Sequence, residues 1–326
     1  MKFGVLQFFS WPERRVDLPT VYERALDRVK TMDQNGYDAV WLAEHHFSTY
    51  SVCPSVHIMG MHIANQTRNI RIGTGVSLAG FYHPLRLAEE VALLDNLSGG
   101  RINWGAGRGF DLTEMNAFGV SRDDSYEKFR ENVEIVLAAW RSDRLTYEGT
   151  YYQFEDIEVL PKPYQDPMPT WIAASTEPAI EWAASMGQAI LMDPHSSHAE
   201  IGQKQKFYHN TMASHGHTNT QDIPVARLMA IAPTDEKARA VAQAGAEWTV
   251  GSYANGKTAG GPPMGLAEDE RVHKYMNEVI IHGCPERVAD QLLELSESIE
   301  LDYLMASILS HETFVLLTDK VLPRIL

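Results

Sequence analysis

Residues 70–109 read IRIGTGVSLAGFYHPLRLAEEVALLDNLSGGRINWGAGRG, two apolar runs that flank an amphipathic segment. The first run, Ile70 to Val76, is rich in β-branched residues and predicts a strand. His83-Pro84 then opens a helix with proline in its permitted first turn, and Gly99-Gly100 ends it. A second strand follows at Arg101 to Ala106. The stretch therefore predicts a strand, a helix and a strand in succession, the unit that builds parallel sheets.

The helix of this stretch carries an apolar stripe, Leu87, Val91, Leu94 and Leu97, which we expect to face the core. The same alternation continues on both sides of it. Further strands are predicted at residues 3–8, 38–43, 170–174, 189–192, 224–231 and 301–307, and further helices at 21–32, 56–64, 129–140, 178–186, 197–215, 235–250 and 288–299. About eight alternations favour an α/β fold closed into a (β/α)8 TIM barrel over an open doubly wound sheet.

No shift in composition marks a second domain, so we expect one barrel domain over residues 1–326. Two insertions interrupt the alternation of strands and helices. The Pro- and Tyr-rich segment 147–167, after the fourth strand, predicts a small hairpin. The segment 251–266, after the seventh strand, is rich in Gly and Pro, and we expect a mobile lid within residues 251–280.

Composition and charge exclude several classes of protein. Hydrophobic residues make up 44% of the chain and charged residues 22%, which is ordinary for a globular protein. The formal net charge of -15 repels nucleic acid and anionic membranes, so neither is an expected partner. Cys53 and Cys284 form no disulfide framework or zinc motif. Without a signal peptide or an apolar span, the chain is expected to be cytoplasmic.

Residues that follow the strands are the candidates for chemistry, because a barrel of this type carries its active site at the carboxyl ends of its strands. Glu44-His45-His46 follows an apolar run, and imidazole exchanges protons near neutral pH. Glycines beside Arg108, together with hydroxyl residues at other strand ends, suit a phosphate group, since small residues let backbone N–H groups approach it. The sequence therefore predicts a phosphorylated cofactor beside a histidine.

Other interpretations of these motifs are weaker. A histidine at a strand end is often a hydrogen-bonded structural residue. A zinc site is rejected because His45 and His46 are neighbours on an extended backbone and point to opposite faces, so no metal is expected. Residues 105–109, GAGRG, lack the third glycine spacing of a dinucleotide fingerprint, and residues 75–79, GVSLA, fall short of a hydrolase elbow.

Five stretches taken in order resemble the bacterial luciferase-like, flavin-dependent monooxygenase family. They are MKFGVLQFF, NGYDAVWLAEHHF, the 70–109 stretch, WIAASTEPAIEWAASMG and HGCPERVADQL. The most specific pieces are EHHF and the HPLRLAEEVALLDNLSGGR helix followed by GAGRG. The resemblance covers nearly the whole chain.

The resemblance implies a (β/α)8 barrel that binds FMN, delivered as reduced flavin by a separate flavin reductase. Molecular oxygen would then form a flavin 4a-hydroperoxide, which oxygenates an aldehyde or another small organic substrate. It also implies a homodimer or a related heterodimer, with helices near the second and third strands as its surface. The sequence identifies neither the substrate nor the reductase.

Matched by position, the resemblance gives roles to individual residues. His45 matches the catalytic histidine, expected to act as a general base or to stabilise the peroxyflavin by hydrogen bonding. Arg108 matches the arginine that binds the flavin phosphate, and Ser175 and Thr176 match further phosphate contacts. Gly75-Val76 matches a non-proline cis peptide beneath the flavin ring.

Two residues differ from those of the light-emitting members of the family. Gly107 stands where the light-emitting subunit has a reactive cysteine, and Ser175 replaces an acidic residue, so light emission is not expected. Two other functions remain open: a deazaflavin-dependent dehydrogenase on the same barrel, and a catalytically silent flavin-binding or subunit-interaction protein. The presence of both His45 and Arg108 argues against the silent protein.

Overall fold

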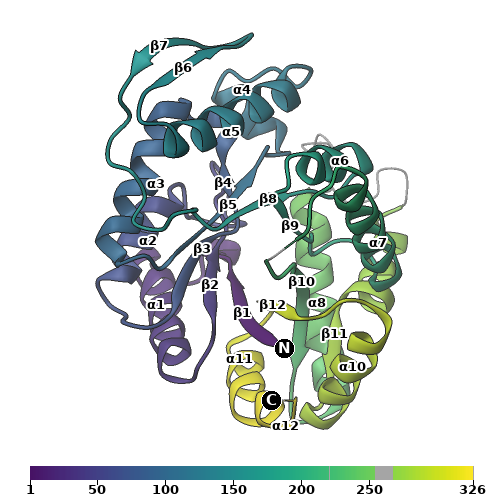
Figure 1. The fold of residues 1–326 in the computed structure, drawn as a ribbon. Coiled ribbons are helices and arrows are strands. Elements are labelled where there is room, and N and C mark those ends of the chain that lie inside the picture. The colour runs from purple at the N-terminus through teal and green to yellow at the C-terminus, as the bar shows by residue number, and fades with distance from the viewer. Residues whose placement is uncertain (220, 254–266, 326) are drawn as a thin grey trace. The chain divides into compact units, whose positions relative to one another are not determined.

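The computed structural model describes residues 1–219, 221–253 and 267–325. The chain forms two compact units (Figure 1). The N-terminal unit is Phe8–Trp171, and the C-terminal unit combines Met1–Gln7 with Ile172–Leu326. Each unit contains parallel strands with helices between them, which confirms the α/β class. Closure into an eight-stranded barrel and a single domain over 1–326 stay predictions.

The N-terminal unit is built on three parallel strands, with β3 between β2 and β5. These three are β2 (Ala39–Leu42), β3 (Arg71–Thr74) and β5 (Ile102–Gly107), and the short strand β4 (Ser77–Leu78) also pairs with β5. Its helices are η1 (Pro12–Arg14), α1 (Leu18–Gln34), α2 (Val56–Ala64), η2 (Ala79–Phe81), α3 (Pro84–Ser98), α4 (Leu112–Ala117) and α5 (Ser125–Arg141). Helices α2 and α3 pack against each other and against these strands (Figure 1).

Helix α3 begins and ends where the sequence predicts. Its first residue is Pro84, and Gly99 closes it in the left-handed conformation with φ 71°. Leu87, Val91 and Leu94 are buried, but Leu97 is 59% exposed, so its predicted place in the core stripe is wrong. Ser98 occupies the inward position of that last turn, because it follows Leu94 by four residues. Successive residues of a helix are about 100° apart, so Leu97 is turned about 100° away from Ser98.

The predicted hairpin is confirmed as β6 (Leu145–Glu148) paired antiparallel with β7 (Gln153–Ile157). The buried carboxylate of Glu131 on α5 holds its turn by accepting hydrogen bonds from three consecutive backbone N–H groups, those of Thr150, Tyr151 and Tyr152.

The C-terminal unit is a second set of parallel strands. Strand β12 (Tyr303–Ile308) lies between β1 (Lys2–Gln7) and β10 (Pro224–Ile231), and β10 pairs on its other edge with β11 (Ile281–Gly283). A bridge from Met192 to Val225 adds β9 (Ala189–Leu191), and β8 (Thr170–Ala173) crosses the boundary of the units. The longer helices are α6 (Glu177–Ser185), α7 (His198–Ser214), α8 (Asp235–Tyr253) and α10 (Pro285–Ser298), and the chain ends with α11 (His311–Leu316), η4 (Leu317–Val321) and α12 (Leu322–Ile325).

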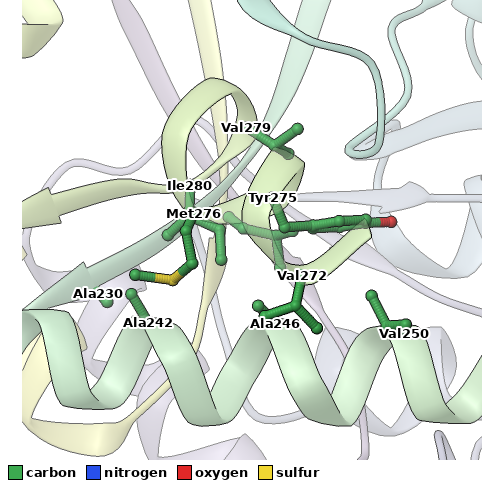
Figure 2. Close-up of a cluster of buried hydrophobic side chains, with 10 residues drawn as sticks. Ala230, Ala242, Ala246, Val250, Val272, Tyr275, Met276, Val279 and Ile280 are labelled. Atoms are coloured by element: carbon green, nitrogen blue, oxygen red, sulfur yellow. The ribbon is translucent and has the colours of Figure 1, made fainter. Parts of the chain in front are cut away.

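The lid prediction, 251–280, falls in part on residues 254–266, which lie outside the described residues. Residues 267–280 are mainly helical, with α9 (Glu268–Lys274) running into a π-helical turn, η3 (Tyr275–Val279). Figure 2 shows how they pack: Ala242, Ala246 and Val250 lie on one face of α8, beneath the side chains of α9 and η3. Small residues four apart let the second helix approach closely.

The short elements that were not predicted include β4, α4, α9 and β11. No helix among the residues that the structure describes is long and apolar enough to cross a membrane.

Candidate functional site

Three sequence-predicted residues or pairs follow neighbouring strands of the N-terminal unit. Leu42 of β2 pairs with Thr74 of β3, and β3 pairs with β5 in parallel. Parallel strands end at the same edge of a sheet, so His45, Gly75-Val76 and Arg108 all follow the carboxyl edge of these strands. Sequence spacing alone therefore placed these three candidates at one edge.

His45 lies on the loop after β2 with 14% of its side chain exposed. Its Nδ1 atom is 3.3 Å from Oε1 of Glu114, a carboxylate that is almost fully buried. The rings of Phe8, Tyr50 and Phe110 lie around the imidazole, Phe8 stacked on it and the other two edge-on. One ring nitrogen is thus held by a carboxylate within an aromatic wall, an arrangement suited to proton exchange through the other nitrogen.

His46 turns to a different carboxylate. Its Nε2 atom is 3.1 Å from Oε1 of Glu44, whose side chain is completely buried. The same carboxylate accepts hydrogen bonds from the Tyr82 hydroxyl at 2.9 Å and from the backbone N–H of Leu78 at 3.2 Å. Burial and the nearby Glu44 charge raise the pKa of Tyr82 well above its usual range, so Tyr82 stays a neutral donor. This saturated network indicates a structural role for His46.

The Gly75–Val76 peptide bond is cis, which confirms the geometry implied by the resemblance. The Val76 side chain lies against β5, where a Cβ atom added to Gly107 would come within 2.3 Å of the valine Cγ2. The position that resembles the reactive cysteine of light-emitting subunits therefore has no room for a side chain in this chain.

Arg108 is half-buried, and its Nη1 atom donates a hydrogen bond to the Ser125 hydroxyl at 3.1 Å. Ser125 is the first residue of α5, a helix of 17 residues. Burial lowers the pKa of Arg108, and the neighbouring Arg122 charge acts in the same direction. A guanidinium at a helix N-terminus gathers positive potential, which favours a bound anion.

Ser175 and Thr176 belong to the C-terminal unit. Both are exposed, and Thr176 is the N-cap residue of α6, although its side chain makes no capping hydrogen bond there. The two hydroxyls thus stand at the start of a helix, where backbone N–H groups favour phosphate. Their predicted contact with a flavin phosphate stays a prediction.

A groove of about 520 Å³ lies beside α2 and α3 in the N-terminal unit. Glu44, His46 and Tyr82 line its polar wall. A second polar set includes the lining residues His57 and Glu90: the buried His57 ring contacts the Ser77 hydroxyl at 2.9 Å and the partly exposed Glu90 carboxylate at 3.3 Å. The contact with His57 holds the pKa of Glu90 at about 2, despite the opposing effect of burial and with help from Arg86.

Cys53, the neighbour of the groove-lining residue Pro54, is a buried free thiol. Burial raises its pKa to about 12, and the Glu44 charge adds to the effect. The thiol is therefore protonated at neutral pH and unsuited to nucleophilic chemistry. Across residues 1–219, 221–253 and 267–325, no group of three or more His, Cys, Asp and Glu side chains is arranged to hold a metal ion.

Glu114 is the site residue that sequence reasoning missed. Asp111 is the N-cap of α4 and accepts hydrogen bonds from the N–H groups of Thr113 and Glu114, so the residues DLTE carry a helix-start signal. That signal could have predicted α4. It could not have shown that the Glu114 carboxylate turns away from the cap toward His45, because that depends on where α4 packs.

Comparisons with known proteins identify the family of the chain. The luciferase-like monooxygenase family matches residues 1–300. The oxygenase component of a flavin-dependent trigonelline monooxygenase from Acinetobacter baylyi is 27% identical over 250 residues, covering 74% of this chain and 68% of that one. An uncharacterised protein of Sinorhizobium fredii is 36% identical over 170 residues, and the chain spans only about half of its length, 50%.

A solved structure extends the similarity to the whole chain. The monooxygenase RslO1 from Streptomyces bottropensis superposes with a TM-score of 0.86 at 26% identity, covering 99% of each chain. Taken with the family match over residues 1–300, this similarity shows that the chain belongs to the luciferase-like monooxygenase family.

Proposed function

We propose that this protein is a flavin-dependent monooxygenase that uses reduced FMN and molecular oxygen to oxygenate a small organic substrate. The observation that carries the proposal is His45, a partly exposed imidazole held by a buried carboxylate at the strand edge that also bears Arg108. The names of the relatives, a trigonelline monooxygenase and the monooxygenase RslO1, support the reaction class.

The residues of the strand edge fit a flavin phosphate. Arg108 and the N-terminus of α5 supply positive charge and directed N–H donors. We expect Ser175 and Thr176 to add hydroxyl donors. Reduced FMN, when bound, supplies the electrons that activate oxygen. Arg108 would bind its phosphate and thereby orient the ring system.

His45 would move the proton that the reaction requires. Because Glu114 faces Nδ1, the working nitrogen is Nε2, which accepts a proton from the reacting group or donates one to it. Phe8, Tyr50 and Phe110 shield the imidazole from bulk water. Their apolar surfaces favour an organic substrate over a highly charged one.

Two partners complete the proposal. A separate flavin reductase would supply the reduced FMN, as the relative named an oxygenase component suggests. We also expect a homodimer or related heterodimer through α2 and α3, where Ile58, Leu93 and Leu97 expose 75%, 49% and 59% of their surface beside the 520 Å³ groove. Sedimentation of the wild type and of Ile58→Lys tests this surface, and a monomeric wild type would exclude it.

The decisive experiment measures cofactor and oxygen together. Purified protein is titrated with FMN, reduced FMN and a reduced deazaflavin, and the competent complexes are then mixed with oxygenated buffer and a panel of aldehydes and aromatic substrates. Oxygen-dependent product formed only with reduced FMN supports the monooxygenase. Hydride transfer from the deazaflavin without oxygen consumption would instead establish the dehydrogenase alternative. Binding of FMN without either reaction would favour the silent protein.

A further inference from the structure

We propose that Glu114 is a positioning residue for His45: its carboxylate holds a proton on Nδ1 and so reserves Nε2 for the proton transfer of the reaction. The catalytic part of this inference rests on the proposed function. The structural part concerns only the ring of His45 and can be tested without turnover.

The geometry comes from a short helix anchored at its own start. Asp111 accepts hydrogen bonds from the N–H groups of Thr113 and Glu114 at 2.6 Å and 3.3 Å, which fixes the first turn of α4. The third residue of such a turn often folds its side chain back to the N-cap N–H group. Glu114 instead directs its Oε1 atom to the backbone N–H of His46, 2.7 Å away, and to Nδ1 of His45, 3.3 Å away.

Burial makes this arrangement selective. The Glu114 side chain is 3% exposed, and a carboxylate taken out of water must be compensated by donors. An Nδ1–H group of His45 provides one donor and the His46 N–H provides the other. The unprotonated Nδ1 form would place a lone pair against the carboxylate oxygen. The carboxylate therefore favours the tautomer with the proton on Nδ1 and also stabilises the imidazolium that forms when Nε2 accepts a proton.

The other groups around the ring do not compete for this role. Tyr50 meets the imidazole edge-on at 5.1 Å between ring centroids, and Phe8 and Phe110 are apolar. The Glu44 carboxylate forms a hydrogen bond with the side chain of His46 and not with that of His45. Among the described residues, Glu114 is thus the carboxylate in hydrogen-bond contact with the His45 ring.

A purely structural role is the alternative. Glu114 could serve only to tie α4 to the loop after β2 through the His46 N–H. Glu114→Gln separates the two roles, because the amide oxygen still accepts that N–H but carries no charge. Glu114→Asp keeps the charge and serves as the conservative variant. The matched control is Glu131→Gln on α5, which removes another buried carboxylate, one that accepts hydrogen bonds from backbone N–H groups of the hairpin turn.

The first measurement uses the protein without substrate. The ¹⁵N signals of the His45 ring, assigned by their loss in His45→Gln, are recorded between about pH 5 and pH 9. We expect Nδ1 to stay protonated throughout this range in the wild type and in Glu131→Gln, and the two tautomers to mix in Glu114→Gln. A wild type with the proton on Nε2, or an unchanged tautomer in Glu114→Gln, would overturn the proposal.

The second measurement is the pH profile of oxygenation. For Glu114→Gln we expect kcat to fall about 10-fold to 100-fold with little change in KM, and the acid limb of kcat/KM to move to lower pH because the carboxylate charge beside the ring is gone. Glu114→Asp should recover part of the rate. An equal loss in Glu131→Gln, or a loss without movement of the limb, would show that Glu114 is only structural. If the wild type forms no oxygenated product, the proposed function fails, while the ring signals still decide whether Glu114 sets the tautomer.

Discussion

Two buried ionic networks, one in each unit, use similar residues in different ways. In the N-terminal unit, Glu114 contacts the ring of His45, which keeps 14% of its surface exposed. In the C-terminal unit, Arg227 is completely buried and donates to the backbone carbonyls of Ser196 at 2.7 Å and Asp193 at 2.8 Å. The first network ends on a group that can exchange protons with a ligand, and the second ends on the backbone.

The charges of the second network are fixed. Burial lowers the pKa of Arg227 to about 10, so it remains cationic at neutral pH. Burial alone would raise the pKa of Asp193, but Lys204, His195 and Arg227 together hold it well below its usual range. The comparison teaches that a buried charge held by backbone carbonyls stabilises the fold, whereas a buried charge that faces a titratable, partly exposed ring can serve chemistry.

The largest expected effect tests the His45–Glu114 network. His45→Gln should lower kcat by about 100-fold to 10,000-fold, because it removes the group that we propose moves the proton. The melting temperature should stay near that of the wild type. Turnover with reduced FMN and circular dichroism measure the two quantities. His209→Gln, a change at an exposed histidine paired with Glu300, is the control. Unchanged turnover in His45→Gln would remove its assigned role.

The Arg227 network predicts a loss of stability instead. Arg227→Met should lower the free energy of unfolding by about 3–5 kcal/mol, because two backbone carbonyls lose their donor and the Asp193 carboxylate loses a neighbouring positive charge. Arg287→Met, in an ion pair whose arginine is 59% exposed, should leave the melting curve nearly unchanged. Similar melting curves for the two variants would contradict an architectural role for Arg227.

Arg108 extends the comparison to a third charge, because its guanidinium is half-buried at the N-terminus of α5 and we propose that it binds the flavin phosphate. Arg108→Met should raise the Kd for FMN by about 10-fold to 100-fold, the loss expected for charge-assisted hydrogen bonds to a phosphate. Riboflavin lacks the phosphate, so its affinity should not change. Fluorescence titration with both flavins measures this difference, and equal losses for the two would refute the phosphate assignment.

Packing at Gly107 predicts a smaller effect. Gly107→Ala places a Cβ atom against Val76 and should cost about 1–3 kcal/mol of stability. Most of this cost should vanish in the Val76→Ala background, because the shorter side chain frees the space. Chemical denaturation of both single variants and the double variant gives the coupling. Additive losses would show that Val76 is not the obstacle.

The smallest effect concerns acid stability. The pKa of Glu90 is lowered from 4.5 to about 2, so its stabilising contribution is fully present above about pH 4.5 and is lost as the pH falls toward 2. Glu90→Gln should therefore flatten this part of the melting-temperature profile. Glu127→Gln, at a glutamate that is 64% exposed, should keep the wild-type slope. If the melting temperature of Glu90→Gln falls with pH as steeply as that of the wild type, the result would argue against the His57 contact.

The sequence by itself determined the alternation of strands and helices and the residues that follow the strands. Helix α2 and strand β10 begin and end where local pattern predicts, because capping residues and β-branched runs act over a few positions. The same local reasoning placed His45, Gly75-Val76 and Arg108 at one edge, since parallel neighbours share the direction of their ends.

Only the tertiary structure decided which groups meet across long separations. Glu114 is 69 positions from His45, and nothing in either neighbourhood encodes their contact. Leu97 has the spacing of a core residue but faces outward, because Ser98 takes the inward position at the end of α3. Local pattern sets the backbone, whereas the partners of a buried carboxylate depend on how separate helices pack, which is a property of the whole fold.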